Sequence, residues 1–375
     1  MDKLWDIVIV GGGLGGLSLA AELAAPGFAH LSVLVLEKRL AYSRDRTWSY
    51  WTERKHRYSH LERTRWSQWS VALGDQMHVH SSHQYAYATI DADAFYRDAL
   101  AAVELASHVQ IQLGCEVQAV STDHVLTAQG KINARTVLDA RPSTQHAPGD
   151  LVQQFTGWEV RTRRDVFTPS CVQLMAFKPH PQGLHFWYVL PYSPRCALVE
   201  STWVSPAQWQ PSYDSELRTY LANLCQGADY EIDYREHGVL GLENTTSKEA
   251  SVIGLGRQGG TLRPSTGYAF IDTVNHAAQL AQSLAVHSSA NQGVWHPQAY
   301  QRPKTEAWMD SVFLDVLRQD WGAAPSYFMR LFERMTPDDT VAFLTGQCSW
   351  AQRLQMMRAL PLRPFASAAL ARVWA

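Results

Sequence analysis

Three glycines near the start of the chain, Gly11, Gly13 and Gly16, have the G-x-G-x-x-G spacing of a dinucleotide-binding turn. Such glycines permit a tight turn, let a pyrophosphate approach the backbone, and let the following helix lie close to the preceding strand. The free N–H groups at the helix N-terminus would then face a diphosphate. Leu14 and Gly15 belong to the same expected phosphate-binding turn.

The segments on either side of the glycines complete this fingerprint. Ile7 to Val10 predicts a buried parallel strand, Leu17 to Ala25 predicts a helix, and Ser32 to Leu36 predicts a second strand. Glu37 follows that strand, about 20 residues after the last glycine, where a carboxylate accepts hydrogen bonds from ribose hydroxyls. Its neighbour Lys38 is expected at the same site. Together these features predict a Rossmann-like domain that binds a dinucleotide.

The length of the chain favours FAD over NAD as that dinucleotide. The 375 residues suffice for two or three domains, so much protein remains to cover an isoalloxazine ring. NAD is the second choice. A plain βαβ unit, whose glycines serve packing only, is the structural alternative.

Composition excludes several other classes of function. A net charge of -2 supplies no basic field, so we expect no nucleic-acid partner. The five cysteines form no C-x-x-C pair, and His78, His80 and His83 have no acidic neighbour, so no metal site or disulfide is expected. Without a signal peptide or a long apolar run, the protein is expected to be cytoplasmic, and soluble or peripheral on a membrane.

The aromatic content points to an apolar ligand. The chain has 14 Trp, 15 Tyr and 12 Phe, an excess that suits the walls of a long apolar cavity. The segment from Lys38 to Trp51 lacks periodicity and is expected to be a loop. Arg44, Arg46, Thr47 and Trp48 in this loop would close over the cofactor. A solvated loop whose aromatic residues pack on the core is the alternative.

Further elements are expected along the first half of the chain. Alternation from Trp66 to Tyr87 predicts antiparallel strands, and Asp91 to Ala106 predicts a helix with Asp91 as its N-cap. Thr136 to Asp139 predicts a buried strand. In a nucleotide-binding fold such a strand end returns to the cofactor crevice, which would place Asp139 there.

The second half alternates between a sheet and helices. Val160 to Ser205 predicts strands that form a substrate platform, and Ser251 to Leu255 predicts a strand that returns to the first domain. A long amphipathic helix follows, capped by Ser265 or Thr266, and its N-terminus would be a second anion site facing the flavin. From Tyr300 onward the chain is expected to be helical, sealing a substrate tunnel or lying on a membrane. The cofactor residues expected here are Gly260, Pro264, Thr266 and Gly267.

These elements predict an α/β protein with a Rossmann-like FAD-binding domain, an inserted β-sheet substrate domain and a helical C-terminal region. The FAD-binding domain would be discontinuous, with residues 46–88 contributing partly to the substrate side. Its expected segments are 1–145 and 250–300, with the substrate domain at 146–249 and the helical region at 301–375.

Several segments together resemble the bacterial lycopene cyclases, which are flavin-dependent enzymes that form carotenoid rings. They occur in family order over nearly the whole chain. The segments are GGGLGGLSLAAEL, the tetrad from Arg46 to Ser49, FWYVLPYSPRCALVESTW at 186–203, GGTLRPSTGYAF at 259–270, and FLTGQCSWAQRLQMMRALPLRP near the C-terminus.

This resemblance implies a glutathione-reductase-type fold and a cyclase that acts on a C40 polyene without net redox change. It implies reduced FAD as cofactor, with NAD(P)H as the reductant. Glu200, in the segment LVEST, is where the family places a glutamate required for acid–base chemistry. An acid that protonates an alkene must stay protonated in an apolar pocket. Trp48, Trp187 and Tyr188 are the candidate aromatic walls that stabilise the cation.

The chain departs from the family at several positions. Ser201 and Met175 stand where the family has acidic residues, and Arg263 and Arg46 stand where it often has histidines. Two alternatives therefore stay open. One is a redox flavoenzyme, a monooxygenase or dehydrogenase of an apolar substrate, and the other is a catalytically silent carotenoid- or lipid-binding paralogue.

Overall fold

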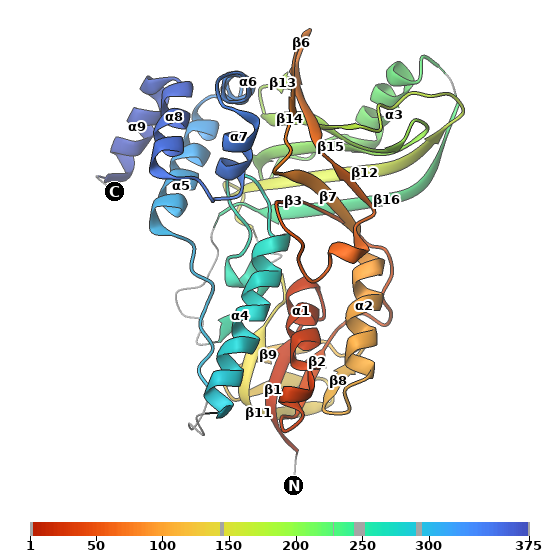
Figure 1. The fold of residues 1–375 in the computed structure, drawn as a ribbon, viewed down its shortest axis with the longest axis vertical. Coiled ribbons are helices and arrows are strands. Elements are labelled where there is room, and N and C mark those ends of the chain that lie inside the picture. The colour runs from red at the N-terminus through yellow and green to blue at the C-terminus, as the bar shows by residue number, and fades with distance from the viewer. Residues whose placement is uncertain (1–2, 143–145, 228, 244–251, 290–294, 374–375) are drawn as a thin grey trace.

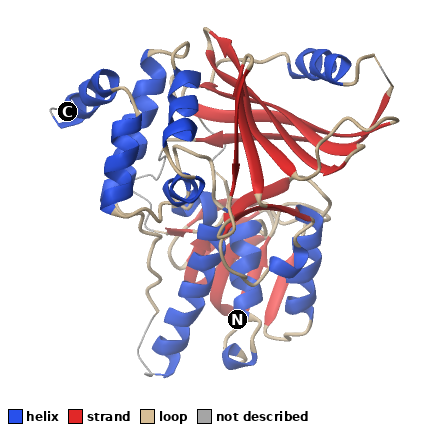
Figure 2. Cartoon of the chain, turned by 45° about the horizontal axis from the view of Figure 1, so that its top comes forward, coloured by secondary structure: helices blue, strands red, loops and turns tan. Residues whose placement is uncertain are grey.

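Three β-sheets and a group of C-terminal helices make up the protein (Figure 1). One sheet with its helices lies at the end of the molecule that carries the N-terminus, and a second sheet and the C-terminal helices lie side by side at the other end (Figures 1 and 2). The computed structural model describes residues 3–142, 146–227, 229–243, 252–289 and 295–373.

The first sheet is built around a parallel core. β1 lies between β2 and β11 and pairs with both in parallel, while β9 and β10 extend the edge in antiparallel fashion. The order is β8-β2-β1-β11-β10-β9, with β17 paired to β11. The strands are β1 (Leu4–Val10), β2 (Val33–Leu36), β8 (Val109–Gln112), β9 (Val117–Val120), β10 (His124–Thr127), β11 (Gly130–Asp139) and β17 (Ile253–Gly254).

Three helices cover one face of this sheet: α1 (Leu14–Leu23), α2 (Ala92–Glu104) and α4 (Phe270–Ser289) (Figure 1). Buried side chains of β1 and β2 pack there on apolar residues of these helices. The short turns that join the elements are η1 (Pro26–Phe28), η2 (Ser59–Leu61) and η3 (Gly256–Gly259). The strand, helix and strand predicted around the glycines are confirmed.

Several predicted element ends are wrong. The first helix begins three residues before Leu17, directly after Gly13. The returning strand is only two residues long, and Ser251 lies outside the described residues, as do the boundaries expected at 145 and 250. The helix after Thr266 begins at Phe270.

Neither predicted cap of α4 binds its N-terminus. The Ser265 hydroxyl donates to Asp310, and Thr266 Oγ1 accepts from the amide of Tyr268. Asp91 stands at the N-cap position of α2, but its carboxylate pairs with Arg44 and Arg63 and not with a helix N–H. The charge-assisted hydrogen bonds to the two arginines thus take the place of a hydrogen bond from Asp91 to the N-terminus of α2.

The second sheet has the order β16-β12-β15-β14-β13-β5-β6. The predicted strands from Trp66 to Tyr87 and from Val160 to Ser205 are confirmed. The strands of the first segment are divided between this sheet and the small sheet described next. The strands are β5 (Gln68–Leu73), β6 (Gln76–Ser81), β12 (Leu151–Thr162), β13 (Cys171–His180), β14 (Gly183–Ser193), β15 (Cys196–Pro206) and β16 (Tyr230–Gly241).

A third, small sheet links the two larger ones. It consists of β3 (Thr47–Thr52), β7 (Ala86–Asp91) and β4 (Thr64–Trp66). The loop expected from Lys38 to Trp51 is therefore wrong from Thr47 onward. The sequence TWSYWT is rich in aromatic and β-branched residues, which favour a strand. Each of its six residues is paired with a residue of β7.

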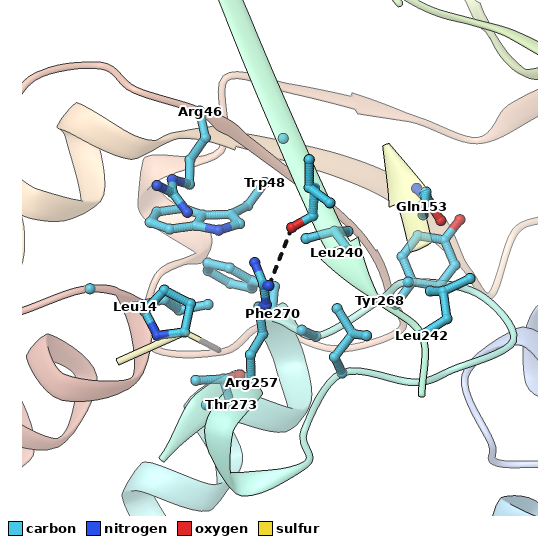
Figure 3. A pocket seen from close by; sticks show the side chains of 18 of the residues that line it. Leu14, Arg46, Trp48, Gln153, Leu240, Leu242, Arg257, Tyr268, Phe270 and Thr273 are labelled. Atoms are coloured by element: carbon cyan, nitrogen blue, oxygen red, sulfur yellow. Dashed lines mark hydrogen bonds between the residues drawn. The ribbon is translucent and has the colours of Figure 1, made fainter. Parts of the chain in front are cut away.

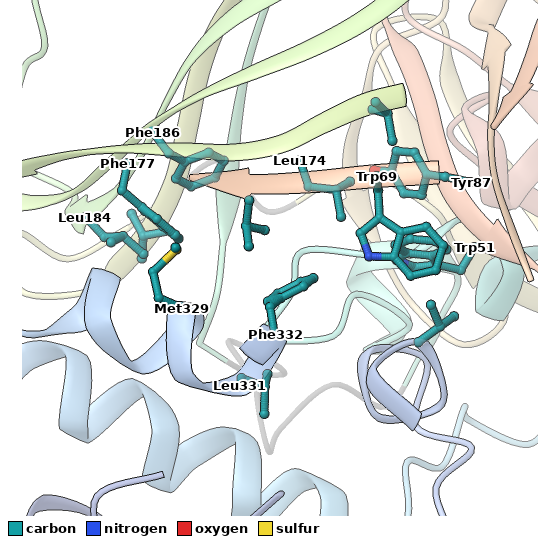
Figure 4. Packing of buried hydrophobic residues seen from close by; sticks show 14 of the residues in the cluster. Trp51, Trp69, Tyr87, Leu174, Phe177, Leu184, Phe186, Met329, Leu331 and Phe332 are labelled. Carbon is teal, nitrogen blue, oxygen red and sulfur yellow. The ribbon is translucent and has the colours of Figure 1, made fainter. Parts of the chain in front are cut away.

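Different helices cover the two faces of the second sheet. One face packs on α3 (Tyr213–Leu224), and the other packs on the C-terminal helices, where Phe177, Leu184 and Phe186 meet Met329 and Phe332 (Figure 4). Among the described residues no helix is long and apolar enough to cross a bilayer. The C-terminal helices are α5 (Lys304–Gln319), α6 (Ala324–Arg334), α7 (Pro337–Leu344), α8 (Trp350–Ala359) and α9 (Leu362–Val373).

A buried ion pair anchors these helices to the loop before α4. Arg263 and Asp310 are 3% and 2% exposed, and their side chains approach to 3.2 Å. Arg263 also donates to the carbonyl of Phe343, and Asp310 accepts from Ser265. Arg263 therefore joins the loop to α5 and α7 and does not line the cavity described below.

We expect Asp310→Ala to lower the free energy of unfolding by about 3–5 kcal/mol, because it leaves the Arg263 guanidinium buried without its counter-charge. Chemical denaturation measures this loss. Asp315→Ala is the matched control on the same helix: it removes partly exposed pairs with Arg372 and Arg318 and should cost about 0–1 kcal/mol. Equal losses in the two variants would contradict the anchoring role.

Candidate active site

A cavity of about 1140 Å³ runs between the first sheet, the second sheet and helices α5 to α7. It begins at the glycine turn before α1 and passes Trp48, Tyr268 and Phe270 (Figure 3). It ends among apolar side chains of the second sheet and the C-terminal helices. These are Leu174, Leu184, Phe186, Phe313, Leu317, Phe328 and Leu344.

The glycine turn forms the first end of the cavity. Gly11 has φ +100, and a Cβ there would meet the backbone of Ala140. A Cβ on Gly16 would collide with the Gly11 carbonyl, so this glycine lets α1 lie close to β1, although it does not line the cavity itself. Gly13 is the N-cap of α1 and has no side-chain cap, so the first N–H groups of the helix face the cavity uncapped.

The buried Glu37 lies at the same end of the cavity. Its carboxylate is 3% exposed and accepts from the backbone amides of Gly12, at 2.6 Å, and Arg39, at 2.9 Å. Uncapped amides can donate to a diphosphate, a bare glycine surface lets it approach, and a carboxylate at the strand end can accept from ribose hydroxyls, as a dinucleotide needs. The residues present therefore fit FAD, with Leu14, Gly15 and the exposed Lys38 beside them on the cavity wall.

Other predicted cofactor residues are placed differently. Asp139 reaches the cavity, but its carboxylate is already bound by the Arg141 guanidinium at 2.7 Å. Thr266 and Gly267 line the cavity. Gly260 and Pro264 do not line it: the first ends η3 with φ +85, and the second is buried.

Two guanidinium groups meet this part of the cavity. Arg46 lies above Trp48, and Arg257 reaches up from η3 to donate to the carbonyl of Val239 at 3.3 Å (Figure 3). Burial lowers the pKa of Arg257, and the charge of Arg46 adds to that effect. Both could offer positive charge to an anionic ligand, although Asp45 already pairs with Arg46 at 2.9 Å. Arg257 was missed from the sequence, although its place just after a returning strand is a usable signal.

Trp48 belongs to an aromatic cluster beside the same wall. Its ring lies 5.2 Å from that of Phe95, edge to face, and 5.8 Å from the ring of Phe270. The hydroxyl of its neighbour Thr47 donates to Glu236 at 2.9 Å. Thr47 thus lines the cavity and orients a carboxylate, a contact that the sequence did not predict.

Glu200 faces the cavity from the middle of the second sheet. It lies on β15, is 7% exposed, and stands directly opposite Tyr188 of β14 in the strand register. On its other side β12 presents Gly157, and beyond Gly157 stands Glu236 of β16. A Cβ on Gly157 would lie 2.9 Å from Glu200 Cγ and 3.2 Å from Glu236 Cγ.

The glycine therefore leaves a gap in which two buried carboxyl groups meet. Burial, and next the charge of Glu236, raise the pKa of Glu200 well above its usual value. Burial raises the pKa of Glu236 to about 7, although hydrogen bonds from Thr47, Glu200 and Tyr234 oppose that rise. Glu236 was missed from the sequence, because no local motif links it to Glu200.

Tyrosines form the wall beside Glu200. The Tyr188 hydroxyl donates to that of Tyr87 at 2.9 Å, and the ring of Tyr268 lies 6.1 Å from the ring of Tyr87. All three line the cavity, and burial raises their pKa values, so the phenols stay neutral. Neutral aromatic rings attract a cation without competing as bases.

The opposite face of the sheet carries residues that the sequence had assigned to the site. Trp187 stacks on Tyr220 of α3 at 4.2 Å, so its predicted role as a wall that stabilises the cation is wrong. Ser201 donates to Glu216 on the same face, where burial lowers the pKa of His185 to about 3. An acidic residue at position 201 would therefore point away from the cavity.

The arrangement can supply a proton to an apolar molecule. Met175 lies among the apolar residues of the lining, in place of the acidic residue that the family resemblance suggested. Across the described parts of the chain no cluster of His, Cys, Asp and Glu could hold a metal ion. Glu200 and the glycine turn thus line one cavity.

Comparison with known proteins identifies relatives over the whole length. The family described as lycopene cyclase protein matches residues 6–370. The chain is 26% identical over 398 aligned positions to lycopene beta-cyclase of Paracoccus sp. (strain N81106 / MBIC 01143), covering 97% of this chain and 96% of that protein.

Solved structures show the same fold at low sequence identity. The flavin-dependent brominase Bmp2 has a TM-score of 0.65 at 14% identity, covering 95% of this chain and 98% of that one. A geranylgeranyl bacteriochlorophyll reductase-like protein from Thermoplasma acidophilum has a TM-score of 0.61 at 13% identity, covering 98% and 99%. The fold is thus the FAD-binding α/β fold that we expected.

We expect Glu37→Gln to weaken FAD binding about tenfold or more, because the neutral amide accepts a weaker hydrogen bond from a ribose hydroxyl than a carboxylate does. Fluorescence titration of the flavin-free protein with FAD measures the affinity. Glu104→Gln, on the exposed side of α2, is the control and should leave the affinity unchanged. An unchanged affinity in Glu37→Gln would rule out this ribose contact.

Proposed function

Since the chain belongs to the lycopene cyclase family, we propose that it is a flavin-dependent carotenoid cyclase acting on lycopene or a related isoprenoid. The observation that carries this proposal is Glu200, a buried carboxyl on the wall of the cavity that joins the glycine turn to the apolar side chains of the C-terminal helices. Burial raises its pKa well above the usual value, which favours the protonated acid that this reaction needs. The enzyme would be an isomerase of the intramolecular lyase type.

The reaction follows from a single proton. The Glu200 carboxyl gives its proton to the terminal double bond of a linear end group, which leaves a tertiary carbocation. The neighbouring double bond attacks that centre and closes a six-membered ring. Loss of a proton from the ring to a carboxylate restores the acid, so substrate and product have the same mass.

The cavity suits each stage of this chemistry. An alkene is a poor base, so the acid must still carry its proton when the substrate binds. Desolvation raises the pKa of Glu200 and so favours its protonated form. The carbocation then needs walls that stabilise it without reacting with it. The rings of Tyr188, Tyr87 and Tyr268 can do so, at up to about 2 kcal/mol each when desolvated. Apolar residues beyond them exclude the water that would trap the cation as an alcohol.

The glycine turn, Glu37 and the α1 N-terminus would hold FAD, and Arg257 and Arg46 would offset its negative charge. When bound in its reduced form, with NAD(P)H as the reductant, the flavin supplies a negative charge that stabilises a cation by electrostatics. This role needs no net oxidation of the substrate. A redox flavoenzyme of an apolar substrate is the alternative, and it would change the mass of the substrate.

Expression in cells that accumulate lycopene tests the reaction. We expect a product of unchanged mass and blue-shifted absorption, seen by chromatography and mass spectrometry. Glu200→Gln should abolish the product, at least a hundredfold, while the purified variant keeps its flavin, because it removes the proton donor. Unchanged lycopene beside a wild-type protein that holds flavin would favour the redox alternative, and an active Glu200→Gln variant would refute the acid.

We further propose that the protein is cytoplasmic and contacts a membrane through α8 and α9, since a carotenoid dissolves in lipid. Trp350, Leu354 and Met357 follow helical spacing along α8 and are 70%, 47% and 48% exposed. Leu362 and Leu370 of α9 are also exposed. Such a row of apolar side chains fits the interface of a bilayer.

We expect the protein to sediment with phosphatidylglycerol liposomes, because the exposed row can bury its apolar area in lipid. Trp350→Ser combined with Leu354→Ser should lower the bound fraction several-fold. Leu40→Ser, at an exposed leucine of the first domain, is the control. A wild-type protein that stays wholly in the supernatant would refute the membrane contact.

A further inference from the structure

We infer that Glu236 is the proton-holding partner of Glu200: the two carboxyl groups share one proton across the gap at Gly157. The shared proton is available to the substrate at neutral pH, and the pair becomes a strong base once that proton has left. This inference rests on the proposed function. Glu236 does not itself line the cavity, so it acts through Glu200 as a positioning residue.

The strand register brings the two carboxyl groups together. Gly157 of β12 is paired with Glu200 on one side and with Glu236 on the other, so all three lie in one row across the sheet. Any side chain at position 157 would separate the two glutamates, since even a Cβ would press on both Cγ atoms. Both glutamates are buried, at 7% and 5% exposed.

The hydrogen bonds around Glu236 are incomplete without a proton from Glu200. Its Oε2 accepts from the hydroxyls of Thr47, at 2.9 Å, and Tyr234, at 3.0 Å. Its Oε1 is buried and has no donor among the described residues when both glutamates are ionised. A protonated Glu200 supplies the missing donor, and the hydroxyl of Thr202 lies 3.4 Å from Glu200 Oε2.

Within the part of the chain that the structure describes, no cation binds the pair directly. Arg44 stacks on the ring of Tyr234 at 3.9 Å, but its guanidinium is bound to Glu159 at 2.6 Å and to Asp91 at 3.2 Å. Other ionisable groups that interact with the two glutamates are Tyr234 on the strand of Glu236, Tyr188 and Tyr192 on β14, and Arg46 just before β3.

Two adjacent carboxyl groups in such a place cannot both ionise at low cost. The anion on Glu236 therefore raises the pKa of Glu200, in addition to the effect of burial. When the O–H bond of Glu200 breaks and a C–H bond forms on the substrate, two carboxylates face each other. That repulsion is relieved when a ring C–H bond breaks and the O–H bond re-forms. The pair thus returns to its first state without an oxidant, a reductant or added water.

The pH dependence of cyclisation tests this role. In Glu236→Gln the neighbouring charge is gone and the amide can donate to Glu200, so the Glu200 pKa should fall. We expect the alkaline limb of kcat/KM to move to lower pH by about 1 unit or more, with activity at pH 8 reduced about tenfold. Gly157→Ala, which presses the pair apart, should move the limb in the same direction. Glu231→Gln, on the exposed side of β16, is the control and should leave the profile unchanged.

Infrared absorption of protonated carboxyl groups gives a readout that needs no substrate. Wild-type protein should keep one such buried group at pH 8, and Glu200→Gln and Glu236→Gln should both alter its band. A Glu236→Gln variant with the wild-type band and an unshifted pH limb would overturn the inference, even if its rate were lower. If wild type cyclises nothing, the proposed function fails, while the infrared band still decides whether the proton is shared.

Discussion

Alternation of side chains across the second sheet is the constraint on which the site depends. Both faces of β14 and β15 are buried, one by α3 and the other by the cavity and the C-terminal helices. Each residue must therefore serve one face only. Tyr188 and Glu200 fall on the cavity face, while Trp187 and Ser201, one position away, fall under α3. A shift of one residue in the register would exchange the two sets and leave the cavity without its acid.

The cavity face combines two demands that usually conflict. Burial of an ionised carboxylate is costly, but a neutral carboxylic acid costs far less and can donate a hydrogen bond. Placing two glutamates on either side of Gly157 lets a single proton serve both groups. The same glycine would weaken an ordinary strand interior, so its position between the glutamates has a clear physical reason.

The sequence predicted the features that depend on local patterns. Gly11, Gly13, Gly16 and Glu37 define their turn by spacing alone, and the strands and C-terminal helices follow from periodicity. Apart from element ends and helix caps, the errors concern long-range pairing. The strand at Thr47 needs β7 as its partner, and Glu236 lies 36 positions from Glu200 along the chain, so only the sheet register brings the two together. Because β14 is buried on both faces, no polar alternation indicated which of its aromatic residues faces the cavity.

A second charge network explains why none of the arginines that the structure describes binds the glutamate pair directly, although several lie close by. Glu159 stands two positions along β12 from Gly157 and binds both Arg44 and Arg63, which also pair with Asp91. Burial opposes ionisation of Glu159, but its two arginines lower its pKa to about 2, so it stays charged. The charges of the two arginines are then balanced by those of Glu159 and Asp91. Little positive charge therefore remains to lower the pKa of Glu200. Buried salt bridges contribute little net stability on average, so the value of this one lies in its electrostatic effect. It ties β12 to the segment before β3 while leaving the neighbouring glutamates dependent on each other for their proton.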